Sequence, residues 1–188
     1  MSFYIGLVHY PVYNRKGEVI ISAITNLDLH DLARLARTYG ARRFYVINPL
    51  IEQQNLARNI CRYWASGYGA HYNKDRQEAM SLISVIPTLE LSIAEIKNSE
   101  GEIPTLLLTD AGRDKGQRVT YNMAREIVAS RKAVMILFGT AWGIAKELIR
   151  KADYLLEPIL GVSNYNHLSV RTAAAITLDR LFPPFVEP

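Results

Sequence analysis

Three short loops carry most of the residues that suit the binding of a polar ligand. They are TDAG at 109–112, FGTAWG at 138–143 and GVSNYNH at 161–167. The third loop concentrates hydroxyl, amide and imidazole groups, although capping a helix takes only one such residue. Groups of this kind on a loop favour a site for a nucleoside-sized ligand. The alternatives are a set of helix caps for the third loop and, for the second, a turn that simply needs glycine.

Several common nucleotide-binding and catalytic motifs are missing. The chain has no G-x-x-x-x-G-K-[ST] phosphate loop and no G-x-S-x-G nucleophile elbow. Its first predicted strand leads into PVYNRKG rather than G-x-G-x-x-G, which disfavours a dinucleotide site. The four histidines are scattered and Cys61 is the single cysteine, so the sequence predicts neither a metal site nor an internal disulfide.

Strands and helices alternate along the chain, and the strands are apolar runs. We expect strands at 3–10, 19–24, 43–49, 105–110, 133–139 and 153–159, and helices at 28–39, 53–66, 75–84, 90–98, 120–130, 143–152 and 169–182. This order predicts an α/β fold with a mostly parallel sheet and helices on both faces. The three loops then lie at the carboxyl edge of the sheet, where such folds bind ligands.

The predicted helix at 53–66 has two distinct faces. Leu56, Ile60, Tyr63 and Trp64 recur at helical spacing and are expected to form its buried stripe. Arg58 and Arg62 lie one turn apart on another face. Like charges at this spacing repel, so the pair indicates either a bound phosphate or an ordinary solvated face.

Length and composition fit one globular domain over residues 1–188. Of the 188 residues, 49% are hydrophobic and 21% are charged, enough for a sizeable core. No apolar run approaches the roughly 20 residues of a membrane span, and no basic leader precedes the first strand. We therefore expect a cytoplasmic protein. The net charge of +4 permits a polyanionic partner without requiring one.

Two stretches near the C-terminus resemble motifs of a known superfamily. FGTAWGI and LEPILGVSNYNHLSVRTAAAI resemble the C-terminal motifs of the SPOUT, or alpha/beta-knot, S-adenosylmethionine-dependent RNA methyltransferases. TNLDLHDLARLARTYGARRFYVINP (25–49) resembles the N-terminal motif of their ribose-methylating branch, and YNHLSVR resembles a small bacterial group among them. The resemblance implies a C-terminal deep trefoil knot, S-adenosylmethionine as cofactor, no metal, tRNA or rRNA as substrate, and a homodimer.

The resemblance also assigns expected roles to individual residues. The cofactor would lie against Thr109, Asp110, Ala111, Phe138, Gly139, Thr140, Ile159, Gly161, Asn166, His167 and Leu168. Arg34 matches the arginine of the N-terminal motif and, with His167, is a candidate catalytic residue. RNA phosphates would bind Arg34, Arg113, Lys115 and Arg118.

Two departures from the ribose-methylating pattern leave the methylated atom open. That branch has Ser-Leu-Asn where this chain has Tyr165–Asn166–His167, and Asn-Glu where it has Thr140–Ala141. Either a base nitrogen or a ribose 2′-oxygen therefore fits. A non-catalytic α/β module that binds a nucleotide or RNA is the alternative function.

Overall fold

A six-stranded parallel sheet forms the centre of the protein. The computed structural model describes residues 2–112, 118–163 and 165–182. The strand order is β5-β4-β1-β7-β6-β8, and every neighbouring pair is parallel. The strands are β1 (Ser2–Val8), β4 (Arg43–Ile47), β5 (Ile83–Ile86), β6 (Thr105–Leu108), β7 (Ala133–Gly139) and β8 (Tyr154–Leu155). The predicted sheet is confirmed.

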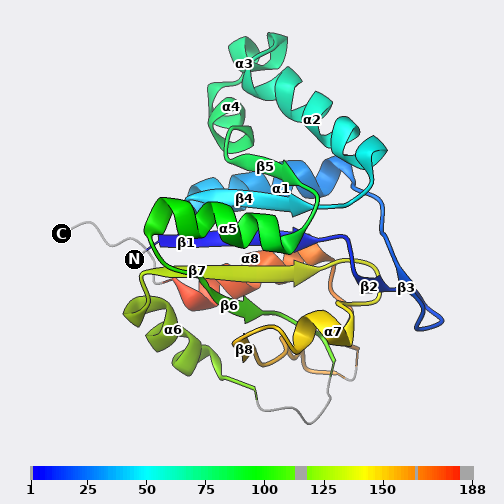
Figure 1. The fold of residues 1–188 in the computed structure, drawn as a ribbon, viewed down its shortest axis with the longest axis vertical. Coiled ribbons are helices and arrows are strands. Elements are labelled where there is room, and N and C mark those ends of the chain that lie inside the picture. The colour runs from blue at the N-terminus through cyan, green and yellow to red at the C-terminus, as the bar shows by residue number, and fades with distance from the viewer. Residues whose placement is uncertain (1, 113–117, 164, 183–188) are drawn as a thin grey trace.

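Both faces of the central strands are buried, which explains why their sequences are continuously apolar. In β1, Ile5 and Leu7 belong to one hydrophobic cluster and Tyr4 and Val8 to the other. The first cluster includes residues of α1 (Asn26–Thr38), α6 (Tyr121–Ser130) and α8 (Val170–Leu181). The second includes residues of α5 (Leu89–Glu100) and α7 (Lys146–Ile149). Figure 1 shows α5 and α7 on the near side of the sheet and α1 and α8 behind it.

Four helices begin where a hydroxyl side chain accepts a hydrogen bond from the backbone of the first turn. Thr25 does this for α1, Thr88 for α5, Thr120 for α6 and Ser169 for α8. Each cap satisfies an N–H group that the helix itself leaves without a partner. None of the helices in the described part of the chain is long and apolar enough to cross a membrane.

The helix at the sheet edge contradicts the predicted buried stripe. In α2 (Ile51–Ala65), Leu56 and Tyr63 are exposed, and Ile60 and Trp64 are only partly buried. The buried positions are Gln54 and Ala57 instead. The reason is that α2 packs against β5 and the short helices α3 (Tyr68–Tyr72) and α4 (Lys74–Met80). There Gln54 fills a buried position by donating from Nε2 to the Asn48 carbonyl at 2.9 Å.

Other expected elements also differ from the structure, among them the strand at 153–159 and the helix at 143–152, which are shortened to β8 and α7. Residues 83–86 form β5, where a helix to 84 was expected, because the β-branched run ISVI pairs with β4. The strand expected at 19–24 is β3 (Val19–Ile20), which pairs antiparallel with β2 (Val12–Tyr13) outside the main sheet. Residues 67–72, between the helices expected at 53–66 and 75–84, contain α3.

Candidate ligand cavity

A cavity of about 520 Å³ opens at the carboxyl ends of β6, β7 and β8. Its lining comes from the segments 109–112, 138–144, 156–159 and 166–170, together with parts of α1, α6 and α8 and the segment leading into α1. Ligand pockets in proteins typically measure about 300–1,000 Å³. The three loops singled out in the sequence therefore meet around a space suited to one nucleoside-sized molecule.

Most of the residues expected to bind the cofactor line this cavity. They are Thr109, Asp110, Ala111, Phe138, Gly139, Thr140, Ile159, Asn166, His167 and Leu168. Gly161 is exposed and is not among the lining residues. Arg34 lies on the exposed side of α1, also outside the lining. Arg113 and Lys115 fall outside the described residues.

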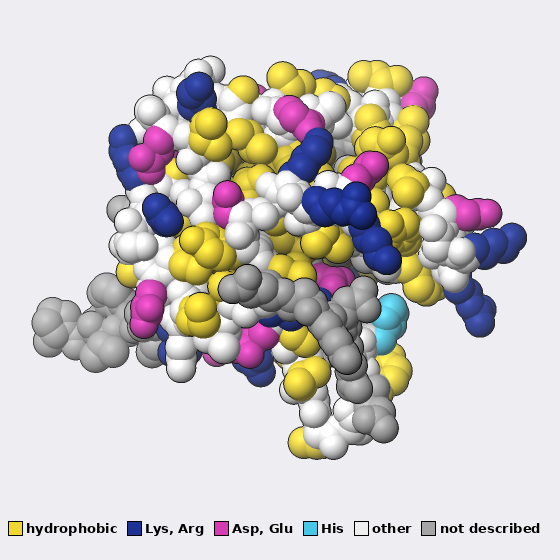
Figure 2. All heavy atoms as spheres, turned by 60° about the horizontal axis from the view of Figure 1, so that its bottom comes forward, with side chains coloured by type: hydrophobic (Ala, Val, Ile, Leu, Met, Phe, Trp, Pro, Cys, Tyr) yellow, Lys and Arg dark blue, Asp and Glu magenta, His cyan; other side chains and the backbone are white. Residues whose placement is uncertain are grey.

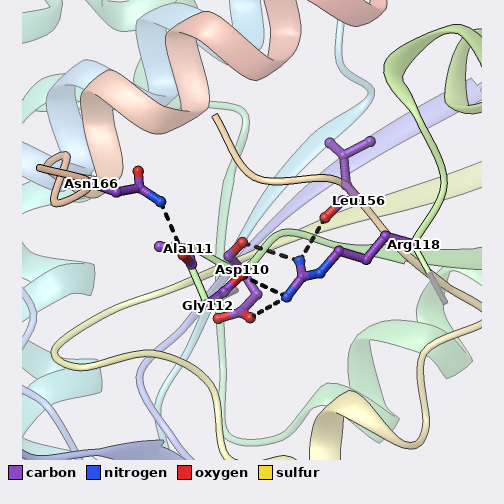
Figure 3. A network of polar contacts seen from close by, with 6 residues as sticks. All are labelled: Asp110, Ala111, Gly112, Arg118, Leu156 and Asn166. Atoms are coloured by element: carbon purple, nitrogen blue, oxygen red, sulfur yellow. Dashed lines mark hydrogen bonds and ion pairs between the residues drawn. The ribbon is translucent and has the colours of Figure 1, made fainter. Parts of the chain in front are cut away.

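Arg118 links the loop after β6 to the segment after β8. Its guanidinium donates to Asp110 Oδ2, the Gly112 carbonyl and the Leu156 carbonyl, each at 2.9 Å (Figure 3). A planar guanidinium suits this task because it presents several donors in a fixed geometry. The Arg118 side chain is 12% exposed and that of Asp110 20%. Its contacts indicate that Arg118 holds the two segments together.

Two polar side chains of the 161–167 loop, those of Ser163 and Asn166, help to shape it. Asn166 Nδ2 donates to the Ala111 carbonyl at 3.0 Å (Figure 3), and Ser163 Oγ accepts from the Tyr165 N–H. Just before the loop, Glu157 Oε1 accepts from the Tyr121 N–H at 2.8 Å. A segment that leaves the sheet must satisfy its polar groups without a regular ladder. This requirement accounts for much of the loop's unusual composition.

A buried chain of hydrogen bonds lies at the cavity wall, and sequence reasoning missed it. His9 Nδ1 lies 2.9 Å from Ser22 Oγ, which lies 2.5 Å from Thr140 Oγ1. Thr140 donates its single hydroxyl hydrogen to the Val8 carbonyl at 3.0 Å, so Ser22 donates to Thr140 and His9 Nδ1 donates to Ser22. Ser22 and Thr140 both line the cavity.

The hydrogen bonds from His9 through Ser22 to Thr140 indicate that His9 is neutral and carries its proton on Nδ1. The ring is fully buried, and its Nε2 has no hydrogen-bond partner within the described residues. Burial lowers the pKa of His9 from 6.5 to about 4, because the charged form would lose its hydration. At neutral pH, His9 therefore serves as a fixed donor that orients Ser22 and, through it, Thr140.

An ion pair ties the last helix to the first beside the cavity. Arg171 Nε lies 3.4 Å from Asp28 Oδ1, and Arg171 Nη1 lies 3.5 Å from Asp31 Oδ2. Asp28 also lines the cavity. Across the described ranges, no group of three or more histidine, cysteine, aspartate or glutamate side chains is arranged to hold a metal ion.

Comparison with known proteins identifies the family that this chain resembles. A family model described as SAM-dependent RNA methyltransferase matches residues 2–183. A "tRNA (guanine-N(1)-)-methyltransferase" of Oleidesulfovibrio alaskensis is 39% identical over 96% of this chain, which spans only 42% of that relative. A protein of Aquifex aeolicus is also 39% identical over 96% of the chain, and 88% of its length is covered.

Solved structures share the fold at low sequence identity. A methylase family protein from Neisseria gonorrhoeae superposes with a TM-score of 0.66 at 14% identity, covering 100% of this chain and 86% of that one. The SpoU methyltransferase AviRb from Streptomyces viridochromogenes, solved with the cofactor AdoMet, gives a TM-score of 0.54 at 13% identity. That match covers 96% of this chain and 58% of AviRb. The resemblance found in the sequence is confirmed.

The buried His9 predicts a specific loss of stability in acid. Between its pKa values of about 6.5 unfolded and about 4 folded, the unfolded state binds the proton more readily. The free energy of unfolding should fall by about 2 to 3 kcal/mol between pH 7.5 and 4.5 through this residue. Urea denaturation of wild type and His9→Asn, which can keep a donor to Ser22, measures the difference. An equal pH dependence in both proteins would contradict the assignment.

The Arg118 cross-link predicts a second stability effect. Arg118→Met leaves the Asp110 carboxylate and two carbonyls without their donor, and should lower the free energy of unfolding by about 2 kcal/mol. The double variant Arg118→Met/Asp110→Asn should lose less, because no unpaired carboxylate remains. Arg37→Met, in an exposed pair with Glu78, is the matched control and should change stability by less than about 0.5 kcal/mol. Similar urea curves for Arg118→Met and Arg37→Met would refute the cross-link.

Proposed function

This chain belongs to the family of S-adenosylmethionine-dependent RNA methyltransferases, and we propose that it methylates tRNA or rRNA in the cytoplasm. The observation that carries the proposal is the convergence of the three loops on one cavity of nucleoside size. The activity is proposed rather than transferred from the named relative, since the chain spans only 42% of that protein.

The cavity suits S-adenosylmethionine by its chemistry. Its walls combine apolar side chains, such as Phe138, Ile144 and Leu156, with backbone groups of the three loops. Within the described residues, the N–H groups of Ile159, His167 and Leu168 donate no hydrogen bond. Free backbone donors beside apolar walls fit a ligand with a flat base and a polar amino-acid end. We assign cofactor binding to the ten lining residues named above, and not to Gly161, which lies outside the cavity lining.

We further propose that residues 1–188 form one domain whose C-terminal segment passes through an earlier loop as a deep trefoil knot. Two contacts support the threading. Arg118 donates to the Leu156 carbonyl and Asn166 to the Ala111 carbonyl, so the segment between β8 and α8 lies against the loop after β6. The chain then continues into α8, which packs on α1 and α6.

Methyl transfer from a sulfonium is an in-line displacement, for which S-adenosylmethionine supplies an electrophilic methyl carbon. With the cofactor bound, the acceptor atom of the RNA would take the methyl carbon, the carbon–sulfur electrons would return to sulfur, and the acceptor would lose a proton. The protein's main task is to hold the acceptor in line. His167 lines the cavity and is exposed, so it can receive the proton from RNA that enters there. Arg34, Arg113 and Lys115 are the proposed phosphate-binding residues, and Arg34 is the second catalytic candidate. Arg118, expected among them, instead donates from its guanidinium to Asp110, Gly112 and Leu156.

The proposal predicts both cofactor binding and methyl transfer. Calorimetry should detect S-adenosylmethionine binding, and labelled methyl groups should pass to unmodified tRNA or rRNA. His167→Ala should lower kcat by about 100-fold while cofactor affinity changes little, since a general base contributes at least that factor. Ser163→Ala, in the same loop but outside the cavity lining, should retain activity.

Each failure has a distinct meaning. No cofactor binding at millimolar concentration would refute the proposed function. Binding without transfer to any RNA would indicate the non-catalytic module instead. Full activity of His167→Ala would remove His167 from the reaction and leave the rest of the proposal intact. Base-resolution mapping of the product would then decide between a base nitrogen and a ribose 2′-oxygen.

The surface around the cavity supports a homodimer. Trp142 and Leu160 are each 59% exposed, Tyr165 is 72% exposed, and Val162 is fully exposed. Figure 2 brings this end of the molecule forward and shows hydrophobic side chains spread over its surface. Exposed apolar side chains gathered in one region are typical of interfaces. We propose that a second copy of the chain covers them, beside the cavity.

The dimer predicts an effect of charge at this surface. Wild type should sediment as a dimer at micromolar concentration, and Leu160→Asp/Val162→Asp should shift it to a monomer, because buried unpaired charges are costly. Leu91→Asp/Ile103→Asp, also at exposed apolar positions, is the control and should remain dimeric. A monomeric wild type would contradict the dimer.

A further inference from the structure

A second surface, at the opposite edge of the sheet, exposes aromatic side chains. Tyr63 on α2 is 48% exposed, and Tyr68 and Tyr72 on α3 are 73% and 77% exposed. Tyr68 and Tyr72 lie four residues apart, so they share one side of α3. Figure 1 shows α2, α3 and α4 beyond β5, whereas β8 lies at the other edge. We call Tyr63, Tyr68, Tyr72, Arg62 and Lys74 the edge surface.

Close packing around Trp64 joins α2 to α3. The Tyr63 ring meets the Trp64 ring edge-on at 5.1 Å between centroids, and the Arg76 guanidinium lies 4.4 Å from the Trp64 ring centroid. Gly69 lets α3 come close to α2, because a Cβ at this position would lie 2.6 Å from the Trp64 ring and 3.0 Å from the Tyr63 ring. Gly67 does the same, because its Cβ would lie 2.8 Å from the Tyr63 carbonyl oxygen. The backbone of α3 is therefore held close to Tyr63 and Trp64, while the rings of Tyr68 and Tyr72 stay exposed.

Positive charge is concentrated in the same segment. Residues 56–76 contain four lysines and arginines against one aspartate, a net +3, while the whole chain carries +4. Arg62 and Lys74 are exposed, and neither takes part in an ion pair with a described residue. Unpaired cations beside exposed aromatic rings attract an anionic ligand with flat groups.

We infer that the edge surface binds a single-stranded segment of the RNA substrate. Bases would stack on Tyr68 and Tyr72, and Arg62 and Lys74 would contact the neighbouring phosphates. Splayed bases stack on aromatic side chains in many RNA-binding proteins, while cations follow the backbone. The inference rests on the proposed function and adds where the RNA lies outside the catalytic cavity.

Charge favours RNA over another protein surface as the occupant. Lysine is depleted in the cores of protein interfaces, whereas Lys74 belongs to the same segment as the exposed rings. A second copy of the chain would bring its own net +3 segment to the same place if the contact were symmetric, and the two would repel. A nucleic acid neutralises that charge instead.

The test measures binding of a fluorescein-labelled, unstructured RNA of about twelve nucleotides, within the range of known single-strand sites. Tyr68→Ala/Tyr72→Ala should weaken binding at least about tenfold without changing its salt dependence, whereas Tyr68→Phe/Tyr72→Phe should bind like wild type. Arg62→Gln/Lys74→Gln should reduce the slope of log K against log salt by about 1.4, since each phosphate contact to a single strand contributes about 0.7. Arg43→Gln/Lys97→Gln, at exposed positions elsewhere, should leave the slope unchanged.

The outcomes separate this inference from the proposed function. If the wild-type protein binds the RNA, and both Tyr68→Ala/Tyr72→Ala and Arg62→Gln/Lys74→Gln bind it equally well, the inference is overturned and the proposed function is not affected. No RNA binding or methylation by wild type would instead count against the proposed function. Conversion of the tyrosine variant from dimer to monomer would show that a second copy occupies the surface, and would also overturn the inference.

Discussion

The cavity depends on keeping the loop after β6 against the segment after β8, a contact that short backbone pairings at Leu108 and Val119 begin and side-chain hydrogen bonds extend. Arg118 does this with one side chain by donating to Asp110 and Gly112 on one side and to Leu156 on the other. Asn166 adds a second link to Ala111. These hydrogen bonds stabilise the fold because, without them, the same polar groups would be shielded from water and have no partner. The ligand's space is thus defined largely by the polar requirements of the backbone around it.

The polar groups around the cavity divide into those that hold the loops in place and those that are open to a ligand. Many polar side chains at the cavity hold loops in place, as Arg118, Asn166, Glu157 and the His9–Ser22–Thr140 chain do. Free backbone donors and the exposed His167 are left to face a ligand. Substrate recognition would then fall to surfaces outside the cavity: the apolar region that a second copy would cover and the cationic, aromatic edge surface. A small domain can in this way bind cofactor and RNA at separate places.

The sheet and the position of the cavity were predictable from the sequence because both follow from short-range patterns. Apolar strands with glycine-containing loops indicated a parallel sheet and its binding edge. The Arg118 cross-link was not predictable, since it joins Asp110 to a carbonyl 38 residues away from the arginine. The His9 chain depends on the register that pairs Val8 with Gly139. The stripe of α2 was predicted wrongly because helical spacing cannot tell what covers a face, and Leu56 and Tyr63 remain 46% and 48% exposed.

The central claim is that the three loops enclose S-adenosylmethionine between them. A crystal structure of the protein grown with this cofactor tests it most directly. The account predicts adenosine density in the cavity, bounded by residues 109–112, 138–144 and 159–168, with the C-terminal segment threaded through the preceding loop. Density for the cofactor at another place, or an unthreaded C-terminal segment beside a cavity closed to the ligand, would contradict it.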